Sequence, residues 1–407
     1  MRSVDEHLAS VLAAVAPLAP FDLQLLDAHG CTLAEDIVAG WDLPPFDNSA
    51  MDGYAVRLAD VAQASESSPA MLPVVGDIAA GSSSVNTIQP GLTARIMTGA
   101  PLPTGAEAVV PVEWTDGGVA SVRITRPPTP GQHIRRRGEE VTAGTTVLHT
   151  GTRLGPAQIG LLAAVGRASV VVRPRPRVVV LSTGSELVEP GAQVGPGQIT
   201  DSNSFMLTTA AREAGAIAYR VGIVPDEPRR LLERIEDQLI RADVVVTSGG
   251  VSVGAYDVVK EVLGRLGTVS FTRVAMQPGM PQGFGVIGSE RTPIFTLPGN
   301  PVSSFVSFEV FVRPALRRMM GMEPLHRPTL TAVCREGVSS PPGRRQYVRA
   351  RLEVAGDRHV VAPVGGAGSH LVAQLAQANA LIVVPEDVTV VSPGDAVQVM
   401  VLERRRS

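Results

Sequence analysis

Glycine and hydroxyl residues end three β-type segments of the sequence, and this pattern indicates a binding site for an anion. The segments are VVVLSTGSEL at 178 to 187, VVVTSGGVSVGAYD at 244 to 257 and FTLPGNPVSSF at 295 to 305. Each segment leads toward a helical pattern, so backbone N–H groups and the positive end of a helix dipole can meet an anion there. In the third segment, Asn300 can cap a helix that begins at Pro301.

Carboxylates lie close to the same segment ends and allow two interpretations. They are Glu186, Asp226 and Asp257. Carboxylates beside phosphate-binding loops are typical of a magnesium site, where substrate phosphates complete the coordination of the metal. Asp226 and Asp257 also stand at the beginning of helical patterns, where aspartate is a good N-cap. Spacing alone leaves both interpretations open, and the histidines show no metal-ligand spacing that would indicate zinc.

The elements that must position these residues alternate between β-type and helical patterns from 172 to 322. We predict strands at 177–182, 217–224, 243–247, 269–275 and 293–297. The helical segments carry apolar residues on one face, as Leu231, Ile235 and Leu239 illustrate. This alternation predicts a doubly wound α/β domain, in which a mostly parallel sheet has helices on both faces and binds its ligand at the carboxyl ends of the strands.

The remaining sequence predicts three further domains. We expect a linking domain from 1–44 and 138–171, a β-rich insert domain over 45–137 and a small C-terminal β-barrel-like domain over 323–407. An amphipathic helix is expected near the N-terminus, because Val4, Leu8 and Val11 follow helical spacing. In the last domain, QYVRARLEV followed by the turn AGDR predicts a β-hairpin. The fold class is therefore α/β and β, with several domains.

Composition excludes several classes of protein. A net charge of -3 and a pI near 6.2 provide no overall attraction to nucleic acid or to an anionic membrane surface, so we expect neither partner. We also expect no membrane span, because no sufficiently long uncharged apolar window occurs. Cys31 and Cys334 belong to no CxxC pair, which fits a reducing compartment, and we predict a cytoplasmic location.

Seven motifs together resemble the molybdopterin molybdenumtransferase family, known as MoeA and as the E domain of gephyrin. They are PPFDNSAMDGYAV at 44 to 56, RIMTGAPLPTGAEAVVPVE at 95 to 113, RRRGEEVTAGT at 135 to 145, STGSEL at 182 to 187, GQITDSN at 197 to 203, SGGVSVGAYDVVK at 248 to 260 and LPGNPVSSFVSF at 297 to 308. The resemblance covers essentially the whole chain. It implies an elongated four-part subunit with a MogA/MoaB-like α/β domain, and an antiparallel homodimer in which the linking domain also serves dimerisation.

The resemblance implies a transferase of molybdenum cofactor biosynthesis. Such an enzyme inserts molybdate into adenylylated molybdopterin with magnesium-dependent loss of AMP, and the product is molybdenum cofactor. A molybdopterin-adenylylating protein and molybdoenzyme acceptors are the implied partners. The active site would lie between the α/β domain of one subunit and the N-terminal β-rich parts of the other.

Residues that match the family motifs inherit expected roles. Asp52 and Thr98 would belong to the site wall given by the partner subunit. The acidic residues of the cleft would be Glu186, Asp226 and Asp257, with Asp257 and Asp226 as magnesium ligands. The residues expected to cradle the nucleotide or pterin phosphates are Ser248, Gly249, Gly250 and Ser252. Those expected to line the oxyanion pocket are Pro298, Pro301, Ser303, Arg349 and Ser369.

The loop VAMQPGMPQGFG at 274 to 285 departs from the family pattern KPGKP. Gln277 and Met280 replace its two lysines, and Glu140 replaces the aspartate that is usual in the RRGED motif. A dianion needs hydrogen-bond donors and positive charge, so a second hypothesis remains open: a pterin-phosphate binding or scaffold protein with weak or altered oxyanion insertion. A third hypothesis is a hydrolase of simple nucleotide phosphates on the same α/β domain.

Overall fold

The structure is a computed structural model that describes residues 1–82, 87–249 and 255–402, with backbone alone at 255–258 and 260. The chain forms two compact units. The first comprises Met1–Asp22, Gly30–Ala34 and Val171–Ser407, and the second comprises Leu23–His29 and Glu35–Val170. The boundaries of the four expected domains stay a prediction.

A six-stranded sheet forms the centre of the first unit. Its strands, in spatial order, are β16 (Ile217–Val224), β13 (Arg177–Thr183), β17 (Val244–Ser248), β21 (Thr292–Leu297), β20 (Pro281–Ile287) and β18 (Gly267–Arg273). The first four are parallel, while β20 pairs antiparallel with both β21 and β18. The five predicted strands are present, and β20 is an additional strand in the glycine-containing segment after Met280.

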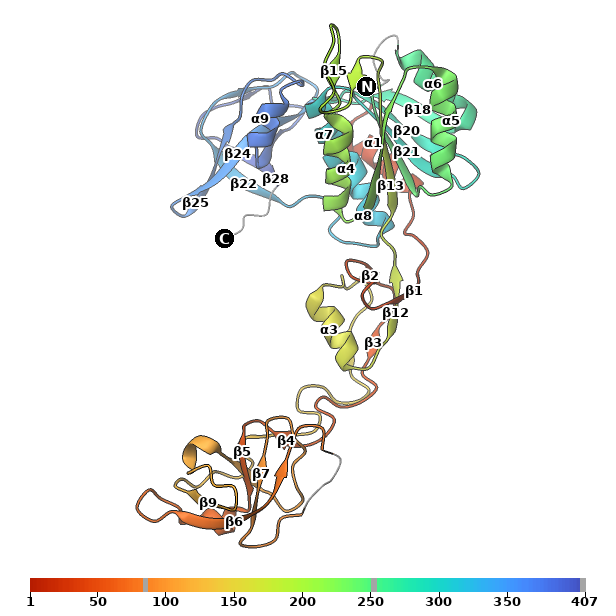
Figure 1. Cartoon of the computed structure of the whole chain (residues 1–407). Helices are drawn as coiled ribbons and strands as arrows, with labels where there is room; N and C mark the ends of the chain where they lie inside the picture. Colours follow the sequence, from red (N-terminus) through yellow and green to blue (C-terminus); the bar gives the residue numbers. More distant parts are fainter. Residues whose placement is uncertain (83–86, 250–254, 403–407) are drawn as a thin grey trace. The chain divides into compact units, whose positions relative to one another are not determined.

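Helices cover both faces of this sheet, as Figure 1 shows. They are α1 (Val4–Ala14), α4 (Asn203–Ala214), α7 (Pro301–Ser307), η2 (Phe308–Val312) and α8 (Arg313–Met319) on one face, and α5 (Pro228–Leu239) and α6 (Ala255–Leu266) on the other. Successive residues of β13 point to opposite faces, so Val180 packs in the first core and Leu181 in the second. The doubly wound α/β fold is confirmed.

The predicted N-terminal helix is α1, and a capping box that was not predicted fixes its beginning. Ser3 and Glu6 form a reciprocal capping box, in which Glu6 N donates to Ser3 Oγ at 3.1 Å and Ser3 N donates to Glu6 Oε2 at 2.9 Å. Val4 and Val11 are buried against the sheet core. This packing anchors the N-terminal segment to the α/β part of the first unit.

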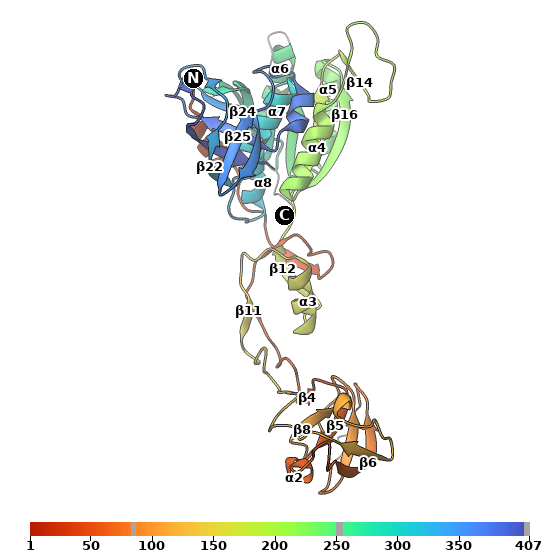
Figure 2. The ribbon, with the colours of Figure 1, turned by 90° about the vertical axis from the view of Figure 1, so that its left-hand side faces the viewer.

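The C-terminal β domain closes on itself. Its strands, in spatial order, are β19 (Met276–Gln277), β24 (Arg345–Ala355), β25 (Arg358–Pro363), β22 (Thr329–Cys334), β28 (Ala396–Val401) and β26 (Ala380–Val384). β24 pairs with both β25 and β26, which closes a barrel of five strands. The predicted hairpin is β24 and β25, visible in Figure 2. The pairing of Gln277 with Gln346 joins the loop at 274–285, where the family pattern is KPGKP, to this barrel.

Shorter elements complete the first unit. They are β14 (Leu187–Val188), β15 (Ile199–Thr200), β23 (Val338–Ser339), β27 (Val390–Val391) and α9 (Val372–Gln377). β14 and β15 form a parallel ladder that leads into α4. Within the parts of the chain that are described, no helix is long and apolar enough to cross a membrane.

A five-stranded sheet dominates the second unit and confirms a β-rich insert. Its strands, in spatial order, are β8 (Ala108–Pro111), β5 (Gly53–Val56), β7 (Thr93–Ile96), β6 (Ala70–Ile78) and β9 (Ser121–Ile124). The other elements of this unit are α2 (Leu58–Val61), η1 (Val112–Trp114), β3 (Ile37–Val38), β4 (Asn48–Ser49), β10 (Ile134–Arg135), β11 (Thr146–Leu148) and α3 (Pro156–Ala164). A further ladder consists of β1 (Phe21–Gln24), β12 (Ser169–Arg173) and β2 (Thr32–Leu33).

Candidate active site

The three strand ends that the sequence singles out meet at one cavity of about 370 Å³. We call it the strand-end cavity. Residues of its wall include Ser182, Gly184, Glu186, Asp201, Asn203, Asp226, Ser248, Gly249, Asn300 and Pro301. β13, β17 and β21 are parallel neighbours, so their carboxyl ends lie at the same edge of the sheet.

Glycine is required at position 249 in the wall of this cavity. Its φ is +97°, and a Cβ there would lie 2.4 Å from the carbonyl oxygen of Thr183. The neighbouring Ser248 is buried, and its Oγ accepts a hydrogen bond from Asn203 Nδ2 at 2.8 Å. Gly250 and Ser252 lie outside the described residues. The described half of this loop therefore brings backbone close to the cavity without a side chain in between.

Asp226 is the acidic residue of the cavity with the most perturbed environment. Burial, followed by the negative charge of Glu186, raises the pKa of the Asp226 carboxyl. Its Oδ1 is buried without a hydrogen-bond partner among the described residues. The capping interpretation is wrong for this residue, because the N-cap of α5 is Glu227 and Asp226 precedes it. A carboxylate pair in this environment suits a cation.

Asp257 is placed by its backbone only. Helix α6 begins at Ala255, so Asp257 belongs to its first turn and is not the residue before the helix. The N-cap interpretation is therefore wrong here too. The side chain of Asp257 lies outside the description, and its expected role as a metal ligand stays a prediction.

Two polar residues of the cavity wall, Asp201 and Asn203, are absent from the predicted site. Asp201 is 1% exposed and accepts hydrogen bonds from the hydroxyls of Ser182 (2.9 Å) and Ser204, and from Arg220 Nη2 (3.2 Å). Asn203 also donates to the carbonyl oxygen of Gly299 at 2.6 Å, and its Oδ1 is buried without a partner among the described residues. The signal that could have found them is the motif GQITDSN, which contains both residues.

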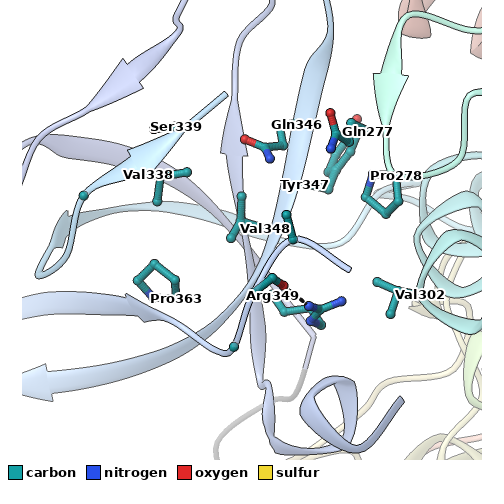
Figure 3. A pocket seen from close by; sticks show the side chains of 14 residues that line it. Gln277, Pro278, Val302, Val338, Ser339, Gln346, Tyr347, Val348, Arg349 and Pro363 are labelled. Atoms are coloured by element: carbon teal, nitrogen blue, oxygen red, sulfur yellow. Dashed lines mark hydrogen bonds between the residues drawn. The ribbon is translucent and has the colours of Figure 1, made fainter. Parts of the chain in front are cut away.

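A second cavity of about 200 Å³ lies between α7 and the C-terminal barrel, and we call it the arginine cavity. Figure 3 shows that Arg349 extends toward Val302, with Gln277, Pro278 and Tyr347 nearby. Arg349 is 5% exposed. Its Nη1 donates to the carbonyl oxygen of Gly368 at 2.9 Å, and its Nη2 donates to that of Gly366.

The guanidinium of Arg349 suits an anion. Burial lowers its pKa, and its Nε is buried without a partner among the residues described. Within this same described region no carboxylate forms an ion pair with it, whereas the nearby Arg345 binds Asp5 at 2.8 Å and Glu386 at 3.0 Å. A buried guanidinium held by carbonyl groups alone keeps its charge available to an oxyanion.

The loop that lacks the two lysines reaches this cavity through Gln277 and Pro278. Met280 lies further along the loop, and the guanidinium of Arg273 contacts its Sδ at 3.3 Å through both Nε and Nη2. Arg273 therefore places a positive charge beside the position of the second lysine. Gln277, at the position of the first lysine, contributes no charge.

The other residues expected at the oxyanion pocket are distributed around the first turn of α7. Pro301 lines the strand-end cavity, whereas the next residue, Val302, lines the arginine cavity. Ser303 is buried, and the carbonyl oxygen of Pro298 accepts a hydrogen bond from Ser304 Oγ. Ser369 accepts a hydrogen bond from Val302 N at 3.0 Å through its carbonyl oxygen. The two cavities thus share the beginning of α7 as a wall.

Asp52 and Thr98 lie together in the second unit. Thr98 donates to Asp52 Oδ1 from its backbone N at 2.7 Å and from its hydroxyl at 2.9 Å. These bonds, the backbone one first, lower the pKa of the Asp52 carboxyl, which is exposed and ionised. Asp52 lies in the loop before β5 and Thr98 follows β7, and together they form an exposed anionic spot.

Comparisons with known proteins agree over the whole chain. Three family models match: "MoeA N-terminal region (domain I and II)" at residues 2–166, "Probable molybdopterin binding domain" at 179–318 and "MoeA C-terminal region (domain IV)" at 331–402. Molybdopterin molybdenumtransferase 2 of Mycobacterium tuberculosis is 50% identical over 98% of this chain and 99% of its own length. Molybdopterin molybdenumtransferase of Bacillus subtilis is 36% identical over 91% and 87%.

A solved structure agrees with these matches. The molybdopterin biosynthesis MoeA protein from Pyrococcus horikosii superposes with a TM-score of 0.78 at 34% identity, covering 99% of both chains. The sheet, the barrel and the β-rich unit thus define a protein of the MoeA fold. The chain belongs to the MoeA family of molybdopterin molybdenumtransferases.

Proposed function

We propose that this protein is an enzyme of molybdenum cofactor biosynthesis that inserts molybdate into adenylylated molybdopterin, with magnesium-dependent release of AMP. The observation that carries this proposal is the strand-end cavity, where three glycine- and hydroxyl-containing strand ends meet a pair of carboxylates. The adjoining arginine cavity adds a buried guanidinium of the opposite charge. The substrate with phosphates can therefore bind on one side of the first turn of α7, and the oxyanion on the other.

The residues of the strand-end cavity bind and orient the phosphate-bearing substrate. The backbone around Ser248 and Gly249 approaches the phosphates closely, because glycine removes the side chain that would separate them. Asp201 holds Ser182 and Ser204 in place, and Asn203 links Ser248 to Gly299. This network positions the three strand ends relative to one another before substrate arrives. Asp201 and Asn203 are therefore positioning residues.

Magnesium fits the carboxylates of this cavity. Burial, followed by the charge of Glu186, raises the pKa of Asp226, and its Oδ1 has no hydrogen-bond partner among the described residues, as expected of a carboxylate that lacks a compensating cation. Asp226 and Glu186 would hold the ion together with Asp257, which the family motif supplies. The ion would neutralise charge on the phosphates as AMP leaves. Among the described residues, no group of three or more His, Cys, Asp or Glu side chains could hold a metal ion. Oxygen atoms of the bound substrate would therefore complete the coordination of magnesium.

Molybdate is the second substrate, and we assign it to the arginine cavity. Arg349 supplies a buried guanidinium, and its Nε is free of any partner that the structure describes. A charge-assisted hydrogen bond from a buried donor contributes about 1.5–3 kcal/mol to binding. This free energy offsets part of the binding that is lost because Gln277 replaces a lysine. Pro298, Pro301, Ser303 and Ser369 surround the turn that separates this cavity from the phosphates, and we propose that they shape the path between them.

The binding or scaffold alternative is not favoured. It rests on the two missing lysines, but the relatives that match over the full chain are named molybdopterin molybdenumtransferases. Arg273 also restores a positive charge beside Met280. The hydrolase alternative lacks a reason for the arginine cavity, since hydrolysis of a nucleotide needs no oxyanion pocket in addition to the phosphate site.

We further propose a homodimer in which Asp52 and Thr98 complete the site of the partner subunit. The family motifs support this assembly, and the hydrogen bonds of Thr98 lower the pKa of the exposed Asp52 carboxyl. A molybdopterin-adenylylating protein would deliver the substrate, and molybdoenzymes would accept the product. We propose a cytoplasmic location, which the free, buried thiols of Cys31 and Cys334 support.

The test is to incubate the purified protein with adenylylated molybdopterin, magnesium and molybdate, and to measure AMP and molybdenum cofactor together. We expect both products in equal amounts, and neither without magnesium. AMP release without molybdenum cofactor would favour the hydrolase, and unchanged nucleotide would favour the binding protein. An Asp257→Ala variant that stays folded should show no magnesium-dependent turnover.

A further inference from the structure

A third cavity, of about 300 Å³, lies between α1 and the edge strand β18. It shares no lining residue with the strand-end cavity or the arginine cavity. The residues that matter for its chemistry are Arg2, His7, Thr268, Ser270, Thr272 and Arg291. We call it the edge cavity. None of the family motifs that carry the proposed reaction includes these residues.

Hydroxyl groups form one wall of the edge cavity. Thr268, Ser270 and Thr272 alternate along β18, so their side chains share one face of the sheet. The first and the last are four positions apart along the strand, which gives about 13 Å of wall. Each hydroxyl can both donate and accept hydrogen bonds. A wall of this kind favours a polar ligand over a hydrocarbon.

Positive charge flanks this wall at both ends. The backbone of Arg2 is fixed beside the end of β18, because Arg2 N donates to Arg273 O at 3.0 Å and Ala275 N donates to Arg2 O at 2.8 Å. Arg291 lies in the turn between β20 and β21, near the beginning of β18. Both arginines are exposed, and neither has a carboxylate partner in the region that the structure describes.

The acidic residues of α1 are already engaged elsewhere. Asp5 binds Arg345 at 2.8 Å, and Glu6 accepts the capping bond from Ser3 N at 2.9 Å. Hydrogen bonds from Ser3, followed by the weaker effect of the Arg2 charge, lower the pKa of the Glu6 carboxyl, but Glu6 and Arg2 form no direct ion pair in the described structure. The guanidinium groups of Arg2 and Arg291 therefore remain available for an external anion.

His7 provides a buried polar atom in the same cavity. The residue is 3% exposed, and its Nδ1 is buried without a hydrogen-bond partner among the described residues. Its ring packs edge-on against Phe311, with 4.7 Å between the ring centres. Burial, followed by the charge of Arg2, lowers the pKa of His7 to about 4, so the ring is neutral near pH 7. An unpaired buried polar atom is unfavourable unless a ligand satisfies it.

We propose that the edge cavity binds a small polar organic anion that carries phosphate or carboxylate groups. Its acidic groups bind Arg2 and Arg291, its body lies along the hydroxyls of β18, and one polar atom reaches His7. The volume suits a metabolite-sized molecule better than a lone inorganic ion. The cavity would stay a ligand site even if the proposed transferase reaction were wrong.

Isothermal titration with three probes tests this inference: ribose 5-phosphate, citrate and inorganic phosphate. We expect ribose 5-phosphate or citrate to bind more tightly than inorganic phosphate, and the better of the two identifies the acidic group. The double variant Arg2→Gln with Arg291→Gln should weaken that binding at least tenfold. Arg153→Gln, an exposed arginine of the second unit, is the matched control and should bind as the wild type does.

Two more variants distinguish a ligand site in the edge cavity from a purely structural role of His7 and from binding in the arginine cavity. His7→Phe keeps the ring against Phe311 but removes Nδ1, so binding should weaken several-fold while the melting temperature does not fall. Arg349→Gln should leave the binding intact, which places the signal outside the arginine cavity. The proposal is overturned if none of the probes binds the wild type or if the double variant binds unchanged. It is equally overturned if the double variant changes only the oligomeric state, because the cavity would then be a subunit contact.

Discussion

The two cavities beside α7 differ in the sign of the charge that they leave uncompensated. In the strand-end cavity, Asp226 faces Glu186 and its Oδ1 has no partner among the described residues. In the arginine cavity, Arg349 is held by two carbonyl groups and its Nε is unpartnered within the same residues. Pro301 and Val302, which are adjacent in the chain, each line one of them.

This difference shows how one short turn can separate a site for a cation from a site for an oxyanion. Burial raises the pKa of a carboxyl and lowers that of a guanidinium, so both cavities disfavour their own charged group. Each therefore gains most from an ion of opposite charge, a cation on one side and an oxyanion on the other. We infer that phosphate chemistry and oxyanion capture are divided between them, and four predictions test that division.

The largest effect is expected for Asp226→Asn. We expect magnesium-dependent AMP release to fall about 10²–10³-fold, the scale of losing one preorganised electrostatic group in an active site. The melting temperature should stay the same or rise, because the variant removes a partly buried negative charge beside Glu186. Turnover at saturating magnesium and a thermal melt measure the two effects. Glu236→Gln, exposed on the helix α5 that follows Asp226, is the control and should change neither.

The next effect is expected for Arg349→Gln. Loss of a charge-assisted donor of about 1.5–3 kcal/mol should raise the KM for molybdate about 10–100-fold. Magnesium dependence should be unchanged, because the strand-end cavity is untouched. Steady-state kinetics over a range of molybdate concentrations measures this split. Arg351→Gln, two residues further along β24 and exposed, is the matched control. An equal loss of magnesium affinity in Arg349→Gln would contradict the division between the cavities.

A gain is expected for Gln277→Lys, because the side chain at 277 lines the arginine cavity and a lysine adds the charge that the family pattern supplies. The KM for molybdate should fall several-fold, and more at low salt, since exposed charges are screened. Met280→Lys should have a smaller effect or a harmful one, because the new ammonium would face Arg273 at the sulfur's position. If the two variants behave alike, Arg273 does not substitute for the second lysine.

The smallest effect concerns pH. The pKa of Asp226 is raised in the folded protein, so its contribution to stability is fully present below the unfolded pKa of about 3.9 and is lost as the pH rises through the folded value. Without magnesium, Asp226→Asn should therefore gain stability relative to the wild type as the pH rises from about 4 to 7. Melting temperatures across this range show it. A constant difference would mean that Asp226 has an ordinary environment.

The elements that position the site could be predicted from the sequence because each follows from local pattern. β13, β17 and β21 are short apolar runs bounded by glycine and hydroxyl residues, and parallel strands bring such ends to one edge. The capping box of α1 is likewise local, since Ser3 and Glu6 are three residues apart. Because these patterns are local, the strand-end cavity could be predicted as an anion-binding site.

Other features depend on contacts between distant segments. Arg349 alternates with apolar residues on β24 and has the pattern of an exposed residue, but α7 and the loop at 366–368 bury it. The strand β20 itself contains one proline and two glycines, and only its pairing with β18 and β21 makes it a strand. Apart from the motif GQITDSN, nothing in the sequence assigns Asp201 and Asn203 to the site, because their partners, Ser182 and Ser248, lie on strands distant in the sequence.

The division between the two cavities is tested most directly by anomalous scattering from crystals of the protein soaked with molybdate. We predict a molybdenum peak in the arginine cavity, within hydrogen-bonding distance of Arg349, and its loss in Arg349→Gln crystals. A peak in the strand-end cavity, or one that persists in the variant, would contradict the account.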